Sequence, residues 1–298
     1  MKKTGFVAIV GRPNAGKSTL LNALIGEKLA IVSNKPQTTR NRITGILTRG
    51  ETQYVFMDTP GMHVPKTRLG SRMVDSVKSA MIGVDAVILV VEPVARPGET
   101  EKELIDRIRK ADLPAVLAIN KIDRSDPASI GDTIKAYSEI YDFDAVVPIS
   151  ALKNKGVDEL LSEVDEFMAE GEWLFPEDAL TDQPEKVVAS EIIREKILRS
   201  LDEEIPHGTA VVIEEFREER GILKIRAEIY CEKDSHKGII IGKGGALLKR
   251  IGTRAREDME RFFGLKVYLD LWVKVKKNWR NSEALLNSLG FTKEETER

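Results

Sequence analysis

The sequence is almost free of cysteine and has no long apolar run. Cys231 is the only cysteine among 298 residues, so the chain cannot form an internal disulfide, and a reducing cytosol fits this composition. No stretch approaches the about 20 consecutive apolar residues of a membrane-spanning helix, so we expect no transmembrane segment. The short N-terminal apolar run continues directly into a glycine motif, which predicts a first strand and not a signal peptide.

The sequence also has no large excess of positive or negative residues and no internal repeats. The formal net charge of -2 by itself neither suggests nor excludes a nucleic-acid partner, because a basic patch can be hidden in a nearly neutral total. Hydrophobic residues make up 42% and charged residues 32% of the chain, as in ordinary globular proteins. We find no repeat and no low-complexity tract, and the length predicts about two domains.

Short apolar runs alternate with helix-length segments up to about residue 170. These runs occupy residues 6–10, 54–57, 86–91, 115–119 and 145–149. Their β-branched character and the intervening helices predict an α/β domain, residues 1–170, around a mixed, mostly parallel sheet. Residues 171–185 contain two prolines and five acids, which indicates a linker.

The remainder of the chain, residues 186–298, has a different order of elements. We expect a helix over 186–203, a hairpin turning at 219–221, two helices around a glycine cluster and a strand rich in valine and lysine. A C-terminal helix follows in the segment SEALLNSLGF. The order α-β-β-α-α-β predicts a second, smaller α+β domain.

The segment GRPNAGKS is a phosphate-binding loop of the form G-x-x-x-x-G-K-[ST]. It follows a predicted strand and opens a predicted helix, which is the context that this motif requires. Backbone N–H groups and the helix N-terminus bind phosphate, lysine neutralises phosphate charge, and the serine hydroxyl binds Mg²⁺. We therefore expect nucleotide contacts from Gly11, Arg12, Pro13, Asn14, Ala15, Gly16, Lys17, Ser18 and Thr19.

Three further motifs follow in the order typical of a GTPase. The segment Asp58-Thr59-Pro60-Gly61 offers a carboxylate to Mg²⁺ through water and a glycine N–H to the γ-phosphate. In Asn120-Lys121-Ile122-Asp123, the Asp123 carboxylate can accept hydrogen bonds from the N1–H and 2-amino groups of guanine, a donor pair that adenine lacks. Ser150-Ala151 matches the backbone contact to the guanine O6. Together the motifs predict GTP over ATP.

Between the first helix and the second apolar run lies the candidate switch I, NKPQTTRNRITG. Thr38 and Thr39 could both coordinate Mg²⁺ once a γ-phosphate is bound, and we favour Thr39. We expect Lys17, Thr39 and Gly61 to take part directly in hydrolysis, and Ser18, Thr39 and Asp58 (through water) to hold the metal.

The order of these motifs, followed by a C-terminal GKGG segment, resembles the Era family of bacterial GTPases over the whole chain. The resemblance implies a Ras-like P-loop domain joined to a type II K-homology (KH) domain. It also implies GTP hydrolysis, binding of 16S ribosomal RNA and a role in 30S subunit assembly. A cytoplasmic monomer with peripheral association at the inner face of the cell membrane is the expected form.

One position departs from the Ras pattern. Ras-type enzymes have a glutamine after the glycine of the second motif, where this chain has Met62, as the Era family has a hydrophobic residue. Catalysis must then use switch backbone groups, a monovalent cation, or a group from RNA or the ribosome. Asn14 resembles the asparagine that holds K⁺ in related GTPases. Arg40 is a weaker candidate for a cation that stabilises the reaction, because we expect its side chain to be solvated.

The second domain contains a basic stretch around its glycine cluster. A G-x-x-G loop between two helices is how KH domains clamp the RNA backbone. From Lys237 to Arg256 there are six basic residues and no acid, whereas the apolar residues Leu247, Leu248, Ile251, Ala255, Met259 and Phe262 have the spacing of a core-facing helix. We expect Trp279 to pack on the final helix. The predicted RNA contacts are Gly242, Lys243, Gly244, Gly245, Lys249, Arg250, Lys276 and Lys277, with Lys274 and Arg280 extending the positive surface.

Three functions are compared on these grounds. The first is an RNA-dependent GTPase, the second a GTPase switch with a protein or membrane partner, and the third a P-loop kinase. The guanine motif and the switch segments argue against the kinase. The basic glycine loop favours RNA over a protein partner.

Overall fold

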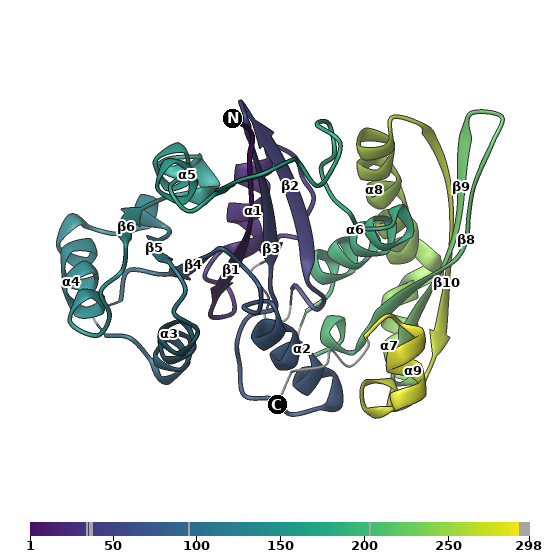
Figure 1. The fold of residues 1–298 in the computed structure, drawn as a ribbon. Helices are drawn as coiled ribbons and strands as arrows, with labels where there is room; N and C mark the ends of the chain where they lie inside the picture. Colours follow the sequence, from purple (N-terminus) through teal and green to yellow (C-terminus); the bar gives the residue numbers. More distant parts are fainter. Residues whose placement is uncertain (34, 36–37, 95, 203, 292–298) are drawn as a thin grey trace.

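The computed structural model describes residues 1–33, 35, 38–94, 96–202 and 204–291. The chain forms two sheets, each with its own helices, which lie side by side (Figure 1). The end of the helix expected to reach Glu203, part of switch I (Asn34, Pro36 and Gln37) and residues 292–298 lie outside this description. Within it, none of the helices combines the length and the apolar character that crossing a bilayer requires.

The first sheet is mixed and mostly parallel, as predicted. Its strands lie in the order β2-β3-β1-β4-β5-β6. Only β2 and the short β7, which pairs with the start of β1, run antiparallel. The bounds are β1 (Lys3–Gly11), β2 (Ile43–Arg49), β3 (Thr52–Asp58), β4 (Ala86–Val91), β5 (Ala115–Ile119), β6 (Ala145–Pro148) and β7 (Ala169–Glu170). The sequence did not predict β2, which is an edge strand without a continuous apolar run.

Helices cover both faces of this sheet. On one face α1 (Lys17–Ile25) and α5 (Val157–Asp165) bury leucine and valine side chains against β1 and β3. On the other face lie α2 (Arg68–Ser79), α3 (Glu99–Ala111) and α4 (Pro127–Ser138). Because β1, β3, β4, β5 and β6 are parallel, their carboxyl ends meet at one edge, where the predicted nucleotide motifs follow.

The C-terminal half has the predicted order α-β-β-α-α-β. Its elements are α6 (Glu185–Ser200), β8 (Ala210–Glu219), β9 (Ile222–Cys231), α7 (Asp234–Ile241), α8 (Ala246–Phe263), β10 (Lys266–Val275) and α9 (Glu283–Ser288). The three strands form a sheet in the order β10-β9-β8, with β9 and β10 parallel. Ile251, Ala255 and Met259 of α8 are buried in its core, as expected. Short 3-10 turns occur at Ile122–Arg124, Ala151–Lys153, Pro206–Gly208, Lys243–Gly245 and Trp279–Asn281.

The hairpin between β8 and β9 turns where the sequence predicts. Glu219 pairs with Ile222, so Arg220 and Gly221 form a two-residue loop, with φ of 54° and 75°. Two positive φ values in succession are typical of a type I′ turn, whose twist matches that of antiparallel strands. The turn therefore fixes the register of the hairpin.

The two halves make a more extensive interface than a flexible connection would require. Phe262, expected in the core of the C-terminal half, instead packs against the apolar cluster around α1 and α5, so that prediction was wrong. Trp279 stacks on Phe291 with ring centroids 6.5 Å apart, and also joins Leu69 and Met73 of α2 in one buried cluster. Residues 279–291 are thus packed between the two halves of the chain.

The predicted linker is hydrogen-bonded along the edge of the first sheet. The Ile46 N–H donates to the Leu180 carbonyl at 2.9 Å, and the Thr181 hydroxyl donates to the Thr44 carbonyl at 2.7 Å. The buried Gln53 amide donates to the Phe175 carbonyl at 2.9 Å. This segment satisfies backbone groups of the edge strand β2, which would otherwise be open to another strand.

Candidate nucleotide and RNA sites

The phosphate-binding loop connects β1 to α1. Gly16 has a φ of +99°, and a Cβ there would lie 2.2 Å from the Asn120 amide nitrogen, so only glycine fits without displacing Asn120. The Lys17 ammonium group donates to the carbonyls of Gly11 at 3.2 Å and Arg12 at 2.8 Å. Burial lowers the pKa of Lys17 to about 8. A phosphate bound beside it would stabilise the charged form.

Three oxygen donors converge beside this loop. The Ser18 hydroxyl donates to Asp58 Oδ2 at 2.6 Å and lies 2.7 Å from the Thr39 hydroxyl, which is itself 3.3 Å from Asp58 Oδ2. The Thr38 hydroxyl lies elsewhere and donates to the Lys35 carbonyl at 2.6 Å. Of the two candidate threonines, Thr39 is thus the one placed with Ser18 and Asp58.

The residues present fit a magnesium ion. Mg²⁺ prefers hard oxygen ligands and is usually held by one or two carboxylates together with phosphate and water. Asp58 Oδ1 is buried and has no hydrogen-bond partner among the described residues. Burial raises the pKa of Asp58 to about 6, and a cation at this position would favour the carboxylate.

Gly61 forms part of the wall of the phosphate site, and Met62 follows it. A Cβ on Gly61 would lie 2.5 Å from the Pro13 Cα, so the two loops can approach only because residue 61 is glycine. The Met62 N–H donates to the Gly11 carbonyl at 3.2 Å, and the Met62 side chain is buried in the core beneath the sheet. The Met62 side chain therefore does not line the phosphate cavity.

Side chains from two loops meet at the base end of the site. The Asn120 amide donates to the Ala15 carbonyl at 2.9 Å and accepts from the Ala151 N–H at 3.0 Å, so it joins the phosphate loop to the Ser150-Ala151 segment. The Ser150 hydroxyl donates to Asp123 Oδ1 at 2.6 Å, which lowers the pKa of Asp123 and orients its carboxylate. Lys121 donates to the Asn14 carbonyl at 2.6 Å.

Six of the nine loop residues predicted to contact the nucleotide line one cavity, and Gly11, Arg12 and Ala15 do not. Its walls are Pro13, Asn14, Gly16, Lys17, Ser18, Thr19, Ile31, Val32, Ser33, Thr38, Thr39, Gly61 and Lys121. The Arg12 side chain points elsewhere, to the buried Glu101 of α3. A contact from Arg12 to the nucleotide would therefore have to come from its backbone.

Arg40 does not match its prediction. It is 3% exposed, and its guanidinium donates to carbonyls of the C-terminal half, Thr209 at 2.6 Å and His207 at 2.9 Å. The prediction of a solvated switch arginine was wrong because these acceptors lie some 170 positions further along the chain. No local pattern in the sequence indicates them.

In the C-terminal half, the glycine cluster joins α7 to α8. Gly242, Gly244 and Gly245 have φ values of 74°, 59° and 81°, which favour glycine. Lys243, Lys249 and Arg250 are exposed, and no ion pair is found for them within the described residues. A groove beside the loop is lined by Gly245, Leu248, Lys249, Gly252, Thr253, Arg256, Leu269 and Leu271.

The second basic segment is less positive than its sequence suggests. Lys274 pairs with Glu228, and Arg280 pairs with Glu232 at 2.5 Å. Lys276 lies over the Tyr230 ring, 5.5 Å from its centroid, and Lys277 is exposed. Among the four basic residues of this segment, Lys276 and Lys277 have no ion pair with a described residue.

Family models match both halves of the chain. A family model described as "50S ribosome-binding GTPase" matches residues 6–121, and a KH domain model matches residues 204–280. GTPase Era of Clostridium kluyveri is 51% identical over 98% of this chain and 100% of its own length. GTPase Era of Ruminiclostridium cellulolyticum is 50% identical over 97% of each chain.

Two solved structures share the whole fold. A variant of Aquifex aeolicus Era bound to GDP·AlF4⁻ has a TM-score of 0.93 and 39% identity, covering 97% of this chain and 99% of its own. Era in complex with MgGDPNP and nucleotides 1506–1542 of 16S ribosomal RNA has a TM-score of 0.92 and 39% identity, covering 98% of this chain and 99% of its own.

The fold and the sites define a P-loop GTPase whose G domain is followed by a KH domain. More particularly, the chain belongs to the Era family of GTPases.

Proposed function

We propose that this GTPase binds 16S ribosomal RNA through its KH domain and acts in 30S subunit assembly, with GTP hydrolysis controlling its release. The observation that carries the proposal is the exposed basic glycine loop on the same chain as a cavity lined by the phosphate loop and switch I. A relative of the same fold is seen with MgGDPNP and nucleotides 1506–1542 of 16S ribosomal RNA. The matching family model is described by binding to the 50S subunit, but we propose RNA of the small subunit as the partner, because the complex of this relative contains 16S RNA.

The roles of the site residues follow from their positions. Backbone N–H groups of the loop Gly11–Ser18 bind the phosphates, and Lys17 neutralises their charge. Ser18 and Thr39, with Asp58 through water, would hold Mg²⁺, which supplies charge neutralisation at the phosphates. Gly61 offers its N–H to the γ-phosphate, and Asp123, oriented by Ser150, selects guanine. Thr59 and Pro60, in the same turn between Asp58 and Gly61, are also proposed to contact the nucleotide.

The RNA site is proposed to comprise the glycine loop, Lys249 and Arg250, with Lys276 and Lys277 extending it. Small residues let the phosphate backbone approach, and the exposed cations attract it. We also propose functional units of residues 1–170 and 186–298 joined by 171–185, and a monomeric, cytoplasmic protein. Peripheral association with the cell membrane stays a prediction from the family resemblance.

Crosslinking of RNA to the protein, followed by sequencing, tests this function. We expect reads from the 3′ region of 16S RNA, and more of them with a non-hydrolysable GTP analogue than with GDP. Binding should weaken steeply as salt rises, because phosphate contacts release counterions. Recovery of no ribosomal RNA in either nucleotide state would favour a protein or membrane partner instead.

A monovalent cation is proposed to assist hydrolysis, because Met62 cannot orient water. Asn14 lines the phosphate cavity, and we propose it as a K⁺ ligand. GTPase activity should rise when Na⁺ is replaced by K⁺, and Asn14→Ala should remove that difference while leaving nucleotide binding mostly intact. Steady-state phosphate release in the two salts measures this.

The matched control for this experiment is Asn278→Ala. Asn278 has a left-handed φ of 54°, close to the 65° of Asn14, but lies in the C-terminal domain. It should keep the full response to K⁺. Equal hydrolysis rates of the parent protein in Na⁺ and K⁺ would contradict the cation proposal.

A further inference from the structure

The two residues that flank Thr39 are held by the KH domain, in which we include α6 although the family match begins at residue 204. The Thr38 carbonyl accepts a hydrogen bond from the guanidinium of Arg194, on α6. On the other side, the Arg40 guanidinium donates to the carbonyls of Thr209 and His207 at 2.6 and 2.9 Å. Arg40 and Arg194 are each 3% exposed. The candidate metal ligand of switch I thus lies between two contacts to another domain.

These two contacts are specific in their geometry. Glu191 holds Arg194 from the preceding turn of α6, accepting from Nε at 2.7 Å and from Nη2 at 2.6 Å. Arg40 has no carboxylate partner among the described residues, and its guanidinium lies over the Trp279 ring, 5.8 Å from the centroid. A buried guanidinium needs its acceptors in fixed directions, so the arrangement persists only while the domains stay docked.

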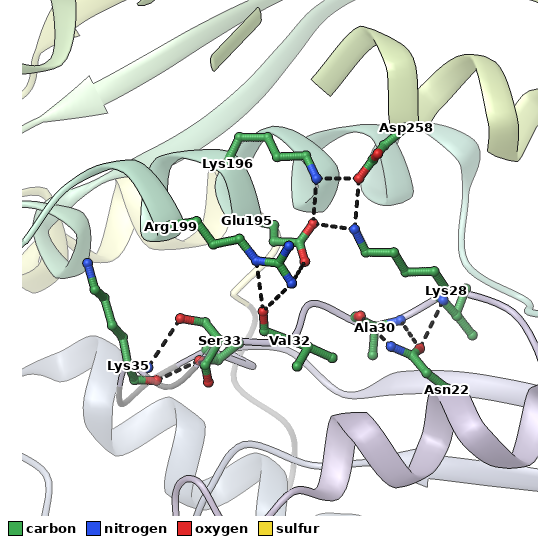
Figure 2. Close-up of polar contacts among 12 residues, drawn as sticks. Asn22, Lys28, Ala30, Val32, Ser33, Lys35, Glu195, Lys196, Arg199 and Asp258 are labelled. Carbon is green, nitrogen blue, oxygen red and sulfur yellow. Dashed lines mark hydrogen bonds and ion pairs between the residues drawn. The ribbon is translucent and has the colours of Figure 1, made fainter. Parts of the chain in front are cut away.

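Thr39 belongs to the segment of residues 28–42 between α1 and β2, and the beginning of this segment is held by α6 and α8 (Figure 2). Lys28 Nζ lies 2.7 Å from both Glu195 Oε2 and Asp258 Oδ2, and Lys196 joins the same cluster. Further along, Arg199 donates to the Val32 carbonyl at 3.0 Å. The KH domain therefore contacts this segment at both ends, although none of the segment's described residues lies in a helix or strand.

We propose that the KH domain positions Thr39 for Mg²⁺, and that Arg194 and Arg40 are positioning residues for GTP hydrolysis. The inference rests on the proposed role of Thr39 as a metal ligand. A loop without secondary structure does not fix its own side chains, and ordering it at the moment of binding costs conformational entropy. Here the KH domain orders the loop beforehand, so that the Thr39 hydroxyl lies 2.7 Å from the Ser18 hydroxyl and beside Asp58.

The decisive variant is Arg194→Ala in the full-length protein. Loss of residues that orient a metal ligand typically lowers metal affinity or activity by about 10–100-fold. We expect the Mg²⁺ concentration for half-maximal hydrolysis to rise by about tenfold or more, with the KM for GTP within about threefold of the parent value. Hydrogen exchange of residues 38–42 in the metal-free, GDP-free protein should become faster.

The matched control is Arg199→Ala, on the same helix and touching the same segment at Val32, away from Thr39. Its Mg²⁺ dependence should stay within about twofold of the parent protein. If Arg194→Ala fails to fold by circular dichroism, Arg40→Lys provides a milder test, since lysine keeps the charge but loses the planar fork. Arg40→Lys should raise both the Mg²⁺ concentration for half-maximal hydrolysis and the rate of hydrogen exchange of residues 38–42, each by a smaller factor than Arg194→Ala.

Thr39→Ala separates the two levels of the argument. If Thr39→Ala leaves the Mg²⁺ dependence unchanged, the proposed metal role of Thr39 is wrong and the positioning proposal is overturned with it. If Thr39→Ala raises the Mg²⁺ requirement, but Arg194→Ala and Arg40→Lys leave both the requirement and the exchange of residues 38–42 unchanged, positioning by the KH domain alone is overturned.

Discussion

The Asp123→Asn variant is expected to bind GTP and GDP at least about a hundredfold more weakly than the parent protein and to gain affinity for xanthosine triphosphate. The Asp123 carboxylate accepts from two guanine donors, and each hydrogen bond to a charged group contributes about 1.5–3 kcal/mol. The asparagine amide offers an acceptor for the N1–H of xanthine and a donor for its 2-carbonyl oxygen. Competition of each nucleotide against a fluorescent GDP analogue measures both affinities.

The control for this variant is Ser150→Ala. It removes the hydroxyl that donates to Asp123 Oδ1 at 2.6 Å but leaves the carboxylate in place. We expect a loss of GTP affinity below about tenfold, the scale of one hydrogen bond, and no gain for xanthosine triphosphate. Unchanged GTP affinity in Asp123→Asn would show that another residue selects the base.

Replacing Lys243 and Gly244 together by aspartate is expected to weaken RNA binding by at least about 1–3 kcal/mol and to lower the salt dependence by about one unit for the lost cation. The change removes a cation and places two anions where the RNA phosphates should lie. Nothing lies within 4 Å of a Cβ at Gly244, so the aspartate side chain meets no atom there, although the φ of 59° strains any residue other than glycine. At Gly242, by contrast, a Cβ would lie 2.7 Å from the Leu247 Cβ.

Fluorescence anisotropy with a labelled 3′ fragment of 16S RNA, at several salt concentrations, measures this loss. The matched control is Lys110→Asp with Gly131→Asp, which changes the net charge equally at exposed positions of the G domain. It should bind RNA like the parent protein, and GTP binding should be unchanged in both variants. Any stimulation of hydrolysis by RNA should be lost only in the loop variant, with basal hydrolysis kept.

Normal RNA affinity in the loop variant would move the RNA site to Lys276 and Lys277. Loss of basal hydrolysis as well would show that the glycine loop is coupled to the GTP site. The packing of α6 against α8, which begins at this loop, provides a physical route for such coupling.

The elements that position the nucleotide were predictable because their signals are local. Continuous β-branched runs predicted β4 and β5 with their observed bounds. The phosphate loop and the guanine motif each lie within a few consecutive residues, whose types specify a turn, a cation or a carboxylate directly.

The sequence by itself therefore determined the class of protein and the positions of its phosphate, guanine and glycine-loop motifs. Only the tertiary structure decided how the two domains meet. Arg40 looked like a solvated switch residue, Phe262 like a residue of the KH core, and residues 171–185 like a free linker. Each instead contacts residues far along the chain. Burial and hydrogen bonding across a domain interface depend on which surfaces come together, and no local spacing of residue types encodes that choice.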